Sequence, residues 1–370
     1  MVSNGFEIRS NGTFSSCCVS DKLFVDSEGK PYNVNTHNIQ EVLDSQDRKD
    51  FIENFDKHFK TDCRRCLDVE IAGGDSKRIN EIRNFGNDPG DPNQIKYLDL
   101  KMGNTCNLAC SICWPGASSK WASIFRKEGW GDPRIEQWQE KDSFWQQMGI
   151  LSANSKRIEL SGGEPFMIKK QSKLIEFLVE SGQASEIDIL WITNCTVWPK
   201  NIVEHFKHFK MVRIMLSLDN THEQFEYLRW PGVWKDTYEV FLKWRELDKQ
   251  GIINLGISYS INMLNIWNTP DFHAWAREHE VRVYNNIVWD PMSVSALPLE
   301  FKKLVMEKFA LSNDPSFQTN PAVGADNWIT KFMMQEGDTS QAIKYHNHRV
   351  IKTRGREAFE NAFPVLANYL

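Results

Sequence analysis

The chain has 370 residues, 41% of them hydrophobic and 25% charged, which is enough for a sizeable buried core and more than one domain. The formal net charge of −5 gives no overall basic excess of the kind that many nucleic-acid-binding proteins carry. The chain shows neither a signal-peptide pattern nor an apolar run near the roughly 20 residues of a membrane span, so we expect a cytoplasmic protein without membrane attachment.

Residues 1–90 combine short strand-like pieces with a helical pattern. The apolar pieces FEIR (6–9) and KLFVD (22–26) are typical of short strands, and residues 39–59 follow a helical periodicity. The region ends in the turn-rich residues 86–94, which we expect to be a linker.

After this linker, strand and helix patterns alternate. Helical patterns separate six apolar strand patterns, and the helix over 167–182 ends at Gly182. This alternation predicts an α/β fold with a parallel sheet, arranged as a partial (β/α)6 TIM-like barrel; a doubly wound open sheet has the same local pattern and is the alternative. Residues 298–370 are mostly helical in pattern. The six predicted strands cover residues 95–102, 157–162, 186–194, 211–219, 253–262 and 281–289.

Seven of the eight cysteines are clustered, which in a reducing compartment indicates metal ligands or catalytic groups rather than disulfides. Cys106, Cys110 and Cys113 follow the first barrel strand at spacings of four and three. A structural zinc site normally closes with four ligands, yet no fourth Cys or His lies within the next twenty residues. Three thiolates on a four-iron cluster would leave one iron open for chemistry. A zinc site completed by a remote residue, or unrelated core cysteines, are the alternatives.

The C-x3-C-x2-C spacing after the first strand, with Gly-Gly-Glu-Pro at 162–165 after the second, resembles the radical S-adenosylmethionine (SAM) superfamily. The resemblance implies a 4Fe–4S cluster on the three cysteines, whose open iron chelates the amino and carboxylate groups of S-adenosylmethionine. It implies that an electron from the cluster cleaves this cofactor to methionine and a 5′-deoxyadenosyl radical, which abstracts hydrogen from a substrate. A reducing partner such as flavodoxin or ferredoxin is implied as well.

The same resemblance implies a set of cofactor-binding residues at the strand ends. Gly162 and Gly163 allow the backbone to approach a ligand closely, and Glu164 is able to accept hydrogen bonds from an ammonium group. In similar enzymes a serine and a downstream arginine bind the ribose and carboxylate of the cofactor, and a forked guanidinium suits a carboxylate. A solvated helix end is the alternative for the arginine, and an ordinary core position is the alternative for Ile112 and Asn262. The remaining expected residues are Ser217, Asp219, Arg229, Thr193, Asn194, Ile112 and Asn262.

Four further cysteines, Cys17, Cys18, Cys63 and Cys66, precede the barrel. A short hairpin ending in Cys-Cys, then a helix, then C-x2-C resembles the twitch and SPASM modules of peptide-modifying radical enzymes, although those modules usually follow the barrel. The resemblance implies an auxiliary 4Fe–4S cluster, and a four-cysteine zinc site is the alternative. Because neighbouring side chains in a strand point to opposite faces, a cluster that uses only one cysteine of the adjacent pair and keeps an open iron is a further alternative.

These patterns divide the chain into three expected domains. Residues 1–90 would form the twitch-like auxiliary metal-cluster module, residues 91–297 the radical SAM partial barrel, and residues 298–370 a helical C-terminal extension.

Cys195 follows Thr193-Asn194, at a position where relatives commonly carry glycine. Some radical epimerases use a thiol to return a hydrogen atom to the substrate radical, which suggests the hypothesis that Cys195 is a hydrogen-atom donor. The alternative is a small buried residue beside the loop, because free cysteine is among the most buried residue types.

The leading hypothesis for the substrate is a peptide or protein, modified by crosslinking, thioether formation, epimerisation or oxidation, because auxiliary modules of this kind accompany peptide substrates. RNA or nucleotide modification is the alternative, because two sets of basic residues are candidates for phosphate contacts. For both sets, a solvated helix face is the other explanation. A non-enzymatic iron–sulfur scaffold or electron carrier is a third possibility, and a glycyl-radical activator or cobalamin-dependent methyl transfer is disfavoured. The basic sets are Arg64, Arg65, Lys77, Arg78 and Arg83 near the first cysteines, and His346, His348, Arg349, Lys352, Arg354 and Arg356 in the tail.

Overall fold

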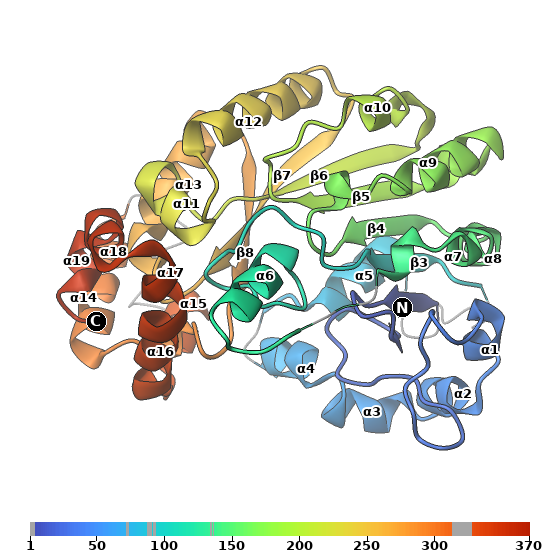
Figure 1. Cartoon of the computed structure of the whole chain (residues 1–370), viewed down its shortest axis with the longest axis horizontal. Helices are drawn as coiled ribbons and strands as arrows, with labels where there is room; N and C mark the ends of the chain where they lie inside the picture. The colour runs from blue at the N-terminus through green and yellow to red at the C-terminus, as the bar shows by residue number, and fades with distance from the viewer. Residues whose placement is uncertain are drawn as a thin grey trace.

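The computed structural model describes residues 4–71, 74–86, 91, 94–133, 135, 137–312 and 328–370. One eight-stranded sheet forms its centre (Figure 1). The strands lie in the order β2 (Phe14–Ser15), β1 (Gly5–Ile8), β3 (Tyr97–Lys101), β4 (Arg157–Ser161), β5 (Asp188–Thr193), β6 (Met211–Ser217), β7 (Asn254–Ile261) and β8 (Arg282–Ile287).

The order of the strands confirms the predicted partial barrel. β3 to β8 are parallel, and each pairs with the next strand along the chain. A doubly wound sheet would reverse this order at a switch point, so that alternative is excluded. Within the described residues the sheet does not close on itself, because β8 and β2 lie at opposite edges.

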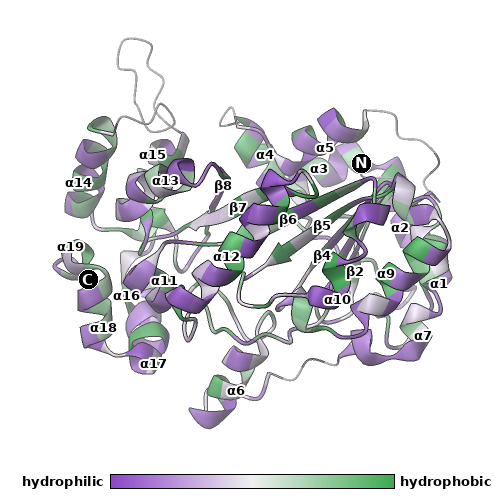
Figure 2. Ribbon diagram, turned by 90° about the horizontal axis from the view of Figure 1, so that it is seen from above, coloured by the Kyte–Doolittle hydropathy of each residue, from purple (hydrophilic) through white to green (hydrophobic). Residues whose placement is uncertain are grey.

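Helices lie in every connection between consecutive barrel strands. The described residues between β3 and β4 include α6 and the two short helices α7 and α8, and α9 to α13 lie in the later connections. Trp191 of β5 donates a hydrogen bond to Gln171 of α9 at 3.0 Å, which identifies the helix-covered face of the sheet. Figure 2 shows mainly green central strands and helices of both colours. The helices are α6 (Ser119–Lys127), α7 (Asp142–Trp145), α8 (Met148–Ser152), α9 (Gln171–Glu180), α10 (Lys200–Val203), α11 (His222–Leu228), α12 (Trp234–Lys249) and α13 (Thr269–Glu278).

The opposite face of the sheet is more polar and becomes more exposed toward β8. Side chains alternate between buried and half-buried along β5 and β6, whereas every second residue of β8 is exposed. Asn286 of β8 donates a hydrogen bond to Ser258 of β7 at 3.0 Å on this face. Gly256 of β7 and Tyr284 of β8 lie on the same face, because a Cβ atom placed on Gly256 would be 2.9 Å from the Tyr284 ring. Parallel sheets are usually apolar on both faces, so this polar surface, here called the inner face, is unusual.

The N-terminal region is joined to the barrel through the sheet. β1 pairs in parallel with β3, with Glu7 opposite Asp99, and antiparallel with β2. The segment 22–26 forms no strand of this sheet. Its one β-bridge joins Val25 to Pro31, and its link to β2 is a hydrogen bond from the backbone N–H of Phe24 to the Phe14 carbonyl at 3.0 Å. The helices of this region are α1 (Ile39–Leu43), α2 (Gln46–Glu53), α3 (Phe55–Thr61), α4 (Arg64–Ile71) and α5 (Lys77–Phe85).

The predicted helix over 39–59 is divided into three. Ser45 caps α2 by accepting a hydrogen bond from the backbone N–H of Arg48, and Asn54 occupies the junction with α3. Serine and asparagine favour such cap positions over helix interiors, which explains both breaks. Part of the predicted linker over 86–94 lies outside the described residues, and the three domain boundaries stay predictions.

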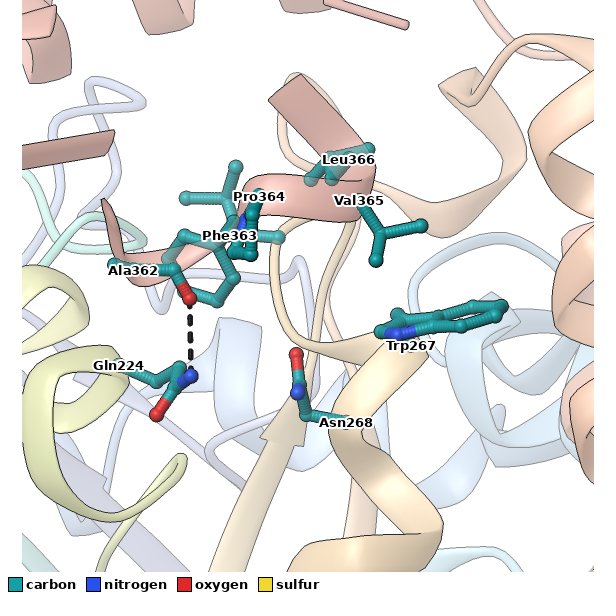
Figure 3. A pocket seen from close by; sticks show the side chains of 9 residues that line it. Gln224, Trp267, Asn268, Ala362, Phe363, Pro364, Val365 and Leu366 are labelled. Carbon is teal, nitrogen blue, oxygen red and sulfur yellow. Dashed lines mark hydrogen bonds between the residues drawn. The ribbon is translucent and has the colours of Figure 1, made fainter. Parts of the chain in front are cut away.

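The C-terminal residues are helical, as expected, and pack against the barrel at α11. Gln224 of α11 donates to the carbonyl of Ala362 at 3.0 Å (Figure 3). The cavity beside this bond has a volume of about 90 Å³, well below the ~300–1,000 Å³ of ligand pockets, and is a packing gap. No helix in the described ranges is long and apolar enough to cross a membrane. The helices are α14 (Leu299–Ala310), α15 (Trp328–Met333), α16 (Thr339–Tyr345), the π-helix η7 (His346–Ile351), α17 (Lys352–Arg354), α18 (Arg356–Ala362) and α19 (Pro364–Ala367).

Candidate active site

Cys106, Cys110 and Cys113 lie on the loop that follows β3, at the carboxyl end of the barrel strands. This is the end at which (β/α) barrels gather their reactive groups. The Cys113 thiol donates a hydrogen bond to Cys110, and this bond, with the charge of Arg229, lowers the pKa of Cys110 to about 7. Burial raises the pKa of Cys106 to about 12. In the part of the chain that the structure describes, no three Cys, His, Asp or Glu side chains lie together as ligands of a single metal ion.

The surroundings of these thiols fit a group bound through thiolates. Asn194 Nδ2 lies 3.8 Å from Cys106 Sγ, and Arg229 Nη1 lies 3.8 Å from Cys110 Sγ. Amide and guanidinium donors aimed at sulfur stabilise the thiolate, which is the form that binds iron. Three thiols with such donors therefore suit an iron–sulfur cluster.

The backbone of this loop is held from two sides. Ser118 donates to the carbonyl of Leu108, and Trp121 Nε1 donates to the carbonyl of Cys110 at 2.8 Å. From the other side, the carbonyls of residues 228 and 230 accept hydrogen bonds from the backbone N–H groups of Ser111 and Ala109, each at 2.7 Å. The positions of the three thiols are thus fixed by α6 and by the turn after α11.

Gly162 and Gly163 allow two loops to touch, and their expected close approach to a ligand stays a prediction. A Cβ on Gly163 would lie 2.2 Å from the carbonyl oxygen of Thr105. Gly162 has a φ of 122°, and a Cβ there would lie 2.9 Å from the backbone nitrogen of Met102. The end of β4 therefore packs directly against the three-cysteine loop only because these residues lack side chains.

Glu164 is fully buried and links the end of β4 to the end of β5. Its carboxylate accepts hydrogen bonds from Thr193 Oγ1 and the backbone N–H of Asn194, both at 2.7 Å, and from the backbone N–H of Phe166 at 3.1 Å. Burial raises the pKa of Glu164 to about 7, although these bonds oppose the shift. An ionised carboxylate accepts about four hydrogen bonds, so room remains for one more donor.

Asp219 and Arg229 form a buried ion pair beside the loop. Arg229 Nη2 lies 2.8 Å from Asp219 Oδ2, and Asp219 Oδ1 accepts from the backbone N–H of Ser260 at 3.0 Å. Arg229 is only 6% exposed, which excludes a solvated helix end. Its Nε is buried without a hydrogen-bond partner among the described residues, so one donor is left for a further anion.

The other expected cofactor residues take different positions. Ser217 is half-buried on the inner face at the end of β6, and Ile112 is half-buried on the loop against the core. Asn262 is fully buried, and its amide bonds to the Ser260 carbonyl at 2.9 Å, so it stabilises the turn after β7.

Cys195 lies in the core rather than at the site. Its thiol is fully buried, and its hydrogen-bond partner is the carbonyl of Thr237 on α12, at 3.8 Å. Its φ of 66° belongs to the left-handed region that favours glycine. This placement supports the interpretation as a small buried residue, and the hydrogen-atom donor role stays a hypothesis.

The structure joins the two N-terminal segments that carry the paired cysteines. The backbone N–H of Asp21 donates to the carbonyl of Asp62 at 2.7 Å, which joins the two cysteine segments. The Cys18 thiol donates to Cys17, so these neighbours do not face apart as they would in a strand. The reason is that β2 ends at Ser15 and residues 17 and 18 lie in a bend and turn. Cys63 lies just before α4 and Cys66 lies within it, and among the described residues the four thiols do not form a group of metal ligands.

Several groups around the sites escaped the sequence reasoning. Glu7, Asp99 and Glu159 lie side by side in register on β1, β3 and β4. Asp99 is fully buried, neither of its carboxyl oxygens has a partner among the described residues, and burial with the nearby charge of Glu159 raises its pKa well above the usual range. Alternation along the strands predicts that such residues share a face, but no sequence signal aligned β1 with β3.

Comparisons with known proteins agree with this geometry. Residues 100–277 match the radical SAM superfamily, and residues 1–67 match SPASM, an iron–sulfur cluster-binding domain. A GTP 3′,8-cyclase from Syntrophomonas wolfei subsp. wolfei is 26% identical over 191 residues, which are 51% of this chain and 54% of that protein. The sporulation killing factor maturation protein SkfB from Bacillus subtilis is 26% identical over 164 residues, which are 44% of this chain and 35% of that protein.

Among solved structures, native anSMEcpe with bound AdoMet has a TM-score of 0.44 at 16% identity, covering 58% of this chain and 59% of that chain. The chain thus spans between 35% and 54% of the length of the two curated relatives named above. The matches fall on the two segments that carry the clustered cysteines, and the chain belongs to the radical SAM superfamily and carries a SPASM iron–sulfur domain ahead of its barrel.

Proposed function

We propose that this chain cleaves S-adenosylmethionine reductively and uses the 5′-deoxyadenosyl radical to modify a residue of a peptide or protein. The observation that carries this proposal is the loop with Cys106, Cys110 and Cys113, fixed at the carboxyl end of β3 with amide and guanidinium donors on its sulfurs. When bound by these thiolates, a 4Fe–4S cluster supplies the electron for the cleavage.

The residues around the loop have separate roles in this proposal. Glu164 retains an acceptor site for the ammonium group of the cofactor, and it holds the end of β5 in place through Thr193 and Asn194. Arg229 balances the charge of the thiolates and offers its Nε to the cofactor carboxylate. Burial of both groups keeps water away from the reacting atoms.

A peptide substrate is supported by the inner face and by the auxiliary module. The inner face carries hydroxyl, amide and aromatic groups at Ser258, Asn286 and Tyr284, which suit the donors and acceptors of a peptide. The SPASM match and the four cysteines that it covers support an auxiliary 4Fe–4S cluster, with zinc as the alternative. SkfB is named for maturation of a sporulation killing factor, which agrees with a peptide product.

The two sets of basic residues give weak support to the nucleic-acid alternative. Most of these cations already contact groups within the chain, and a phosphate would have to compete with the paired carboxylate for the cation. The GTP 3′,8-cyclase similarity keeps a nucleotide substrate as the second candidate. The ion pairs are Arg64–Asp68, Arg65–Asp21, Lys77–Glu159, Arg78–Glu70, Arg83–Asp75, Lys352–Glu128 and Arg356–Glu360.

The test is formation of 5′-deoxyadenosine by anaerobically reconstituted protein after reduction with dithionite and addition of S-adenosylmethionine. Replacing Cys106, Cys110 or Cys113 by Ala should lower this rate at least about 100-fold, since even changes around a metal ligand cost 10–100-fold. Cys195→Ala is the matched control, because it removes a thiol from the core, and its rate should stay near that of the unmodified protein.

The same preparations test the auxiliary site. The double variant Cys63→Ala, Cys66→Ala should lose about four irons per chain, the content of one 4Fe–4S cluster, and still form 5′-deoxyadenosine. Zinc on the Cys106 loop, or no 5′-deoxyadenosine from the unmodified protein, would refute the proposed chemistry. Zinc at the N-terminal cysteines alone would replace only the auxiliary cluster.

A further inference from the structure

The C-terminal segment lies across the helix that follows the three-cysteine loop. The guanidinium of Arg349 in η7 lies over the Phe125 ring at 4.7 Å, and Lys352 of α17 pairs with Glu128 at 3.0 Å. The rings of His348 and Trp130 are 5.1 Å apart. Figure 1 shows α17 next to α6 and α11. The basic tail is therefore folded against α6.

Arg354 continues this contact into the loop itself. Its Nη2 donates a hydrogen bond to the carbonyl oxygen of Ala109, the residue before Cys110. The guanidinium carbon lies 5.9 Å from the Trp121 ring on α6 and 5.3 Å from the Tyr227 ring on α11. Two aromatic faces and one carbonyl thus hold a cation at the back of the three-cysteine loop.

The rest of this guanidinium has no hydrogen-bond partner among the described residues. Nε and Nη1 of Arg354 are buried without a hydrogen bond in the described part of the structure. Burying a cation without compensation is costly, so an anion is expected nearby. The thiols of Cys110 and Cys113 are close enough for their charges to interact with Arg354. Arg229 approaches Cys110 as well, and its Nη1 is 3.8 Å from the sulfur.

We infer that Arg354 is a positioning residue for the cluster of Cys106, Cys110 and Cys113. It fixes the carbonyl of Ala109 and supplies a buried positive charge that favours the more negative, reduced state of the cluster. The inference rests on the proposed function. It extends the site beyond residues 100–277, the range of the superfamily match, because Arg354 belongs to the C-terminal extension.

The test is the reduction potential of the cluster, measured by EPR during redox titration of the full chain without substrate. The signal that changes on addition of S-adenosylmethionine identifies the cluster of the three-cysteine loop. Arg354→Met should make reduction about three- to tenfold less favourable, a shift of roughly −30 to −60 mV at 59 mV per tenfold for one electron. Arg354→Lys keeps the charge and should stay closer to the unmodified protein than Arg354→Met does.

Arg356→Met is the matched control, because it removes the same side chain two residues away, where it forms an exposed pair with Glu360. Its potential should not move. Equal potentials for Arg354→Met and the unmodified protein, or equal shifts in the Met and Lys variants, would overturn the inference. If Arg354→Met does not hold iron, the test rests on Arg354→Lys. A lysine variant that retains iron and has a reduction potential near that of the unmodified protein supports the role of the charge. A large shift of its reduction potential opposes that role. Failure of the unmodified protein to form the cluster would instead count against the proposed function.

Discussion

At the scale of single residues, the site depends on backbone contacts that a motif does not reveal. The Gly-Gly-Glu-Pro motif was identified from the sequence, and its position at the end of β4 agrees with the expectation. Its role was only partly predictable, because a motif names positions and not the atoms they will meet. Gly163 meets the Thr105 carbonyl, and Glu164 meets Thr193 and Asn194, and all of these contacts cross between strand ends.

Gly163→Ala should separate the end of β4 from the three-cysteine loop. The new Cβ would lie 2.2 Å from a backbone oxygen that has no freedom to rotate away, so the loop itself must shift. Overpacking of this kind costs about 1–3 kcal/mol, and we expect that loss in the free energy of unfolding together with a lower iron content. Chemical denaturation and iron analysis of reconstituted protein measure the two effects.

Gly149→Ala is the control for this change. Its added Cβ would meet only Phe177 Cζ at an ordinary 3.7 Å, and alanine favours the helix α8 in which residue 149 lies. This variant should be as stable as the unmodified protein or more so. Equal iron contents and stabilities in the two variants would show that the close contact at Gly163 is not required.

At the scale of elements, the six barrel strands were predictable because each is a short apolar pattern with a helix after it. Two contacts were not. β1 pairs with β3 across the whole N-terminal region, and η7 and α17 return to α6 from the far end of the chain. Local periodicity carries no information on such distant partners, so the sequence does not reveal that part of the basic tail contacts α6.

His346, the first residue of η7, should make the docking of this tail dependent on pH. It is fully buried, its Nε2 lies 3.1 Å from the Tyr227 hydroxyl, and burial with the charges of Arg354 and Arg356 lowers its pKa to about 3. The unfolded chain binds a proton at this residue below pH ~6.5, whereas the folded chain does not until pH ~3. Stability should therefore be full above pH ~6.5 and fall by about 2 kcal/mol on going to pH 5.

Denaturation at pH 7.5, 6.5 and 5 measures this dependence. His346→Gln keeps a polar partner for Tyr227 without a titrating ring, and its stability should fall by about 2 kcal/mol less over the same range. His348→Gln is the control on the same helix, because His348 is exposed, and its pH dependence should match that of the unmodified protein. The same slope in all three proteins would contradict the assignment to His346.

At the scale of the whole molecule, three distant parts of the chain meet around the site. The N-terminal region adds β1 to the barrel sheet, the barrel provides the three-cysteine loop, and the C-terminal extension reaches that loop through Arg354. The sequence predicted these parts as separate domains, because composition marks segments and not the surfaces between them. The polar inner face, exposed toward β8, is the surface on which a substrate is expected.

A substrate bound at the inner face should depend on side-chain contacts there more than on salt. Tyr284 of β8 is 42% exposed on this face, and Leu242 of α12 is 46% exposed on the helix side. We expect Tyr284→Ala to weaken binding of a peptide substrate on the order of tenfold, since exposed aromatic residues often anchor such contacts. Leu242→Ala removes a similarly exposed side chain and should leave binding unchanged.

Fluorescence anisotropy with labelled peptide and labelled RNA, at 50 and 200 mM salt, separates the two substrate classes. Peptide affinity should change by less than about threefold, whereas a protein with several phosphate contacts loses roughly 10³–10⁵ in affinity over this range. The basic residues of both sets are largely engaged with carboxylates, rings and a carbonyl of the chain, so we expect no tight RNA binding at either salt concentration. Tight RNA binding with a steep salt dependence, unaffected by Tyr284→Ala, would instead favour the nucleic-acid alternative and place its contacts away from the inner face.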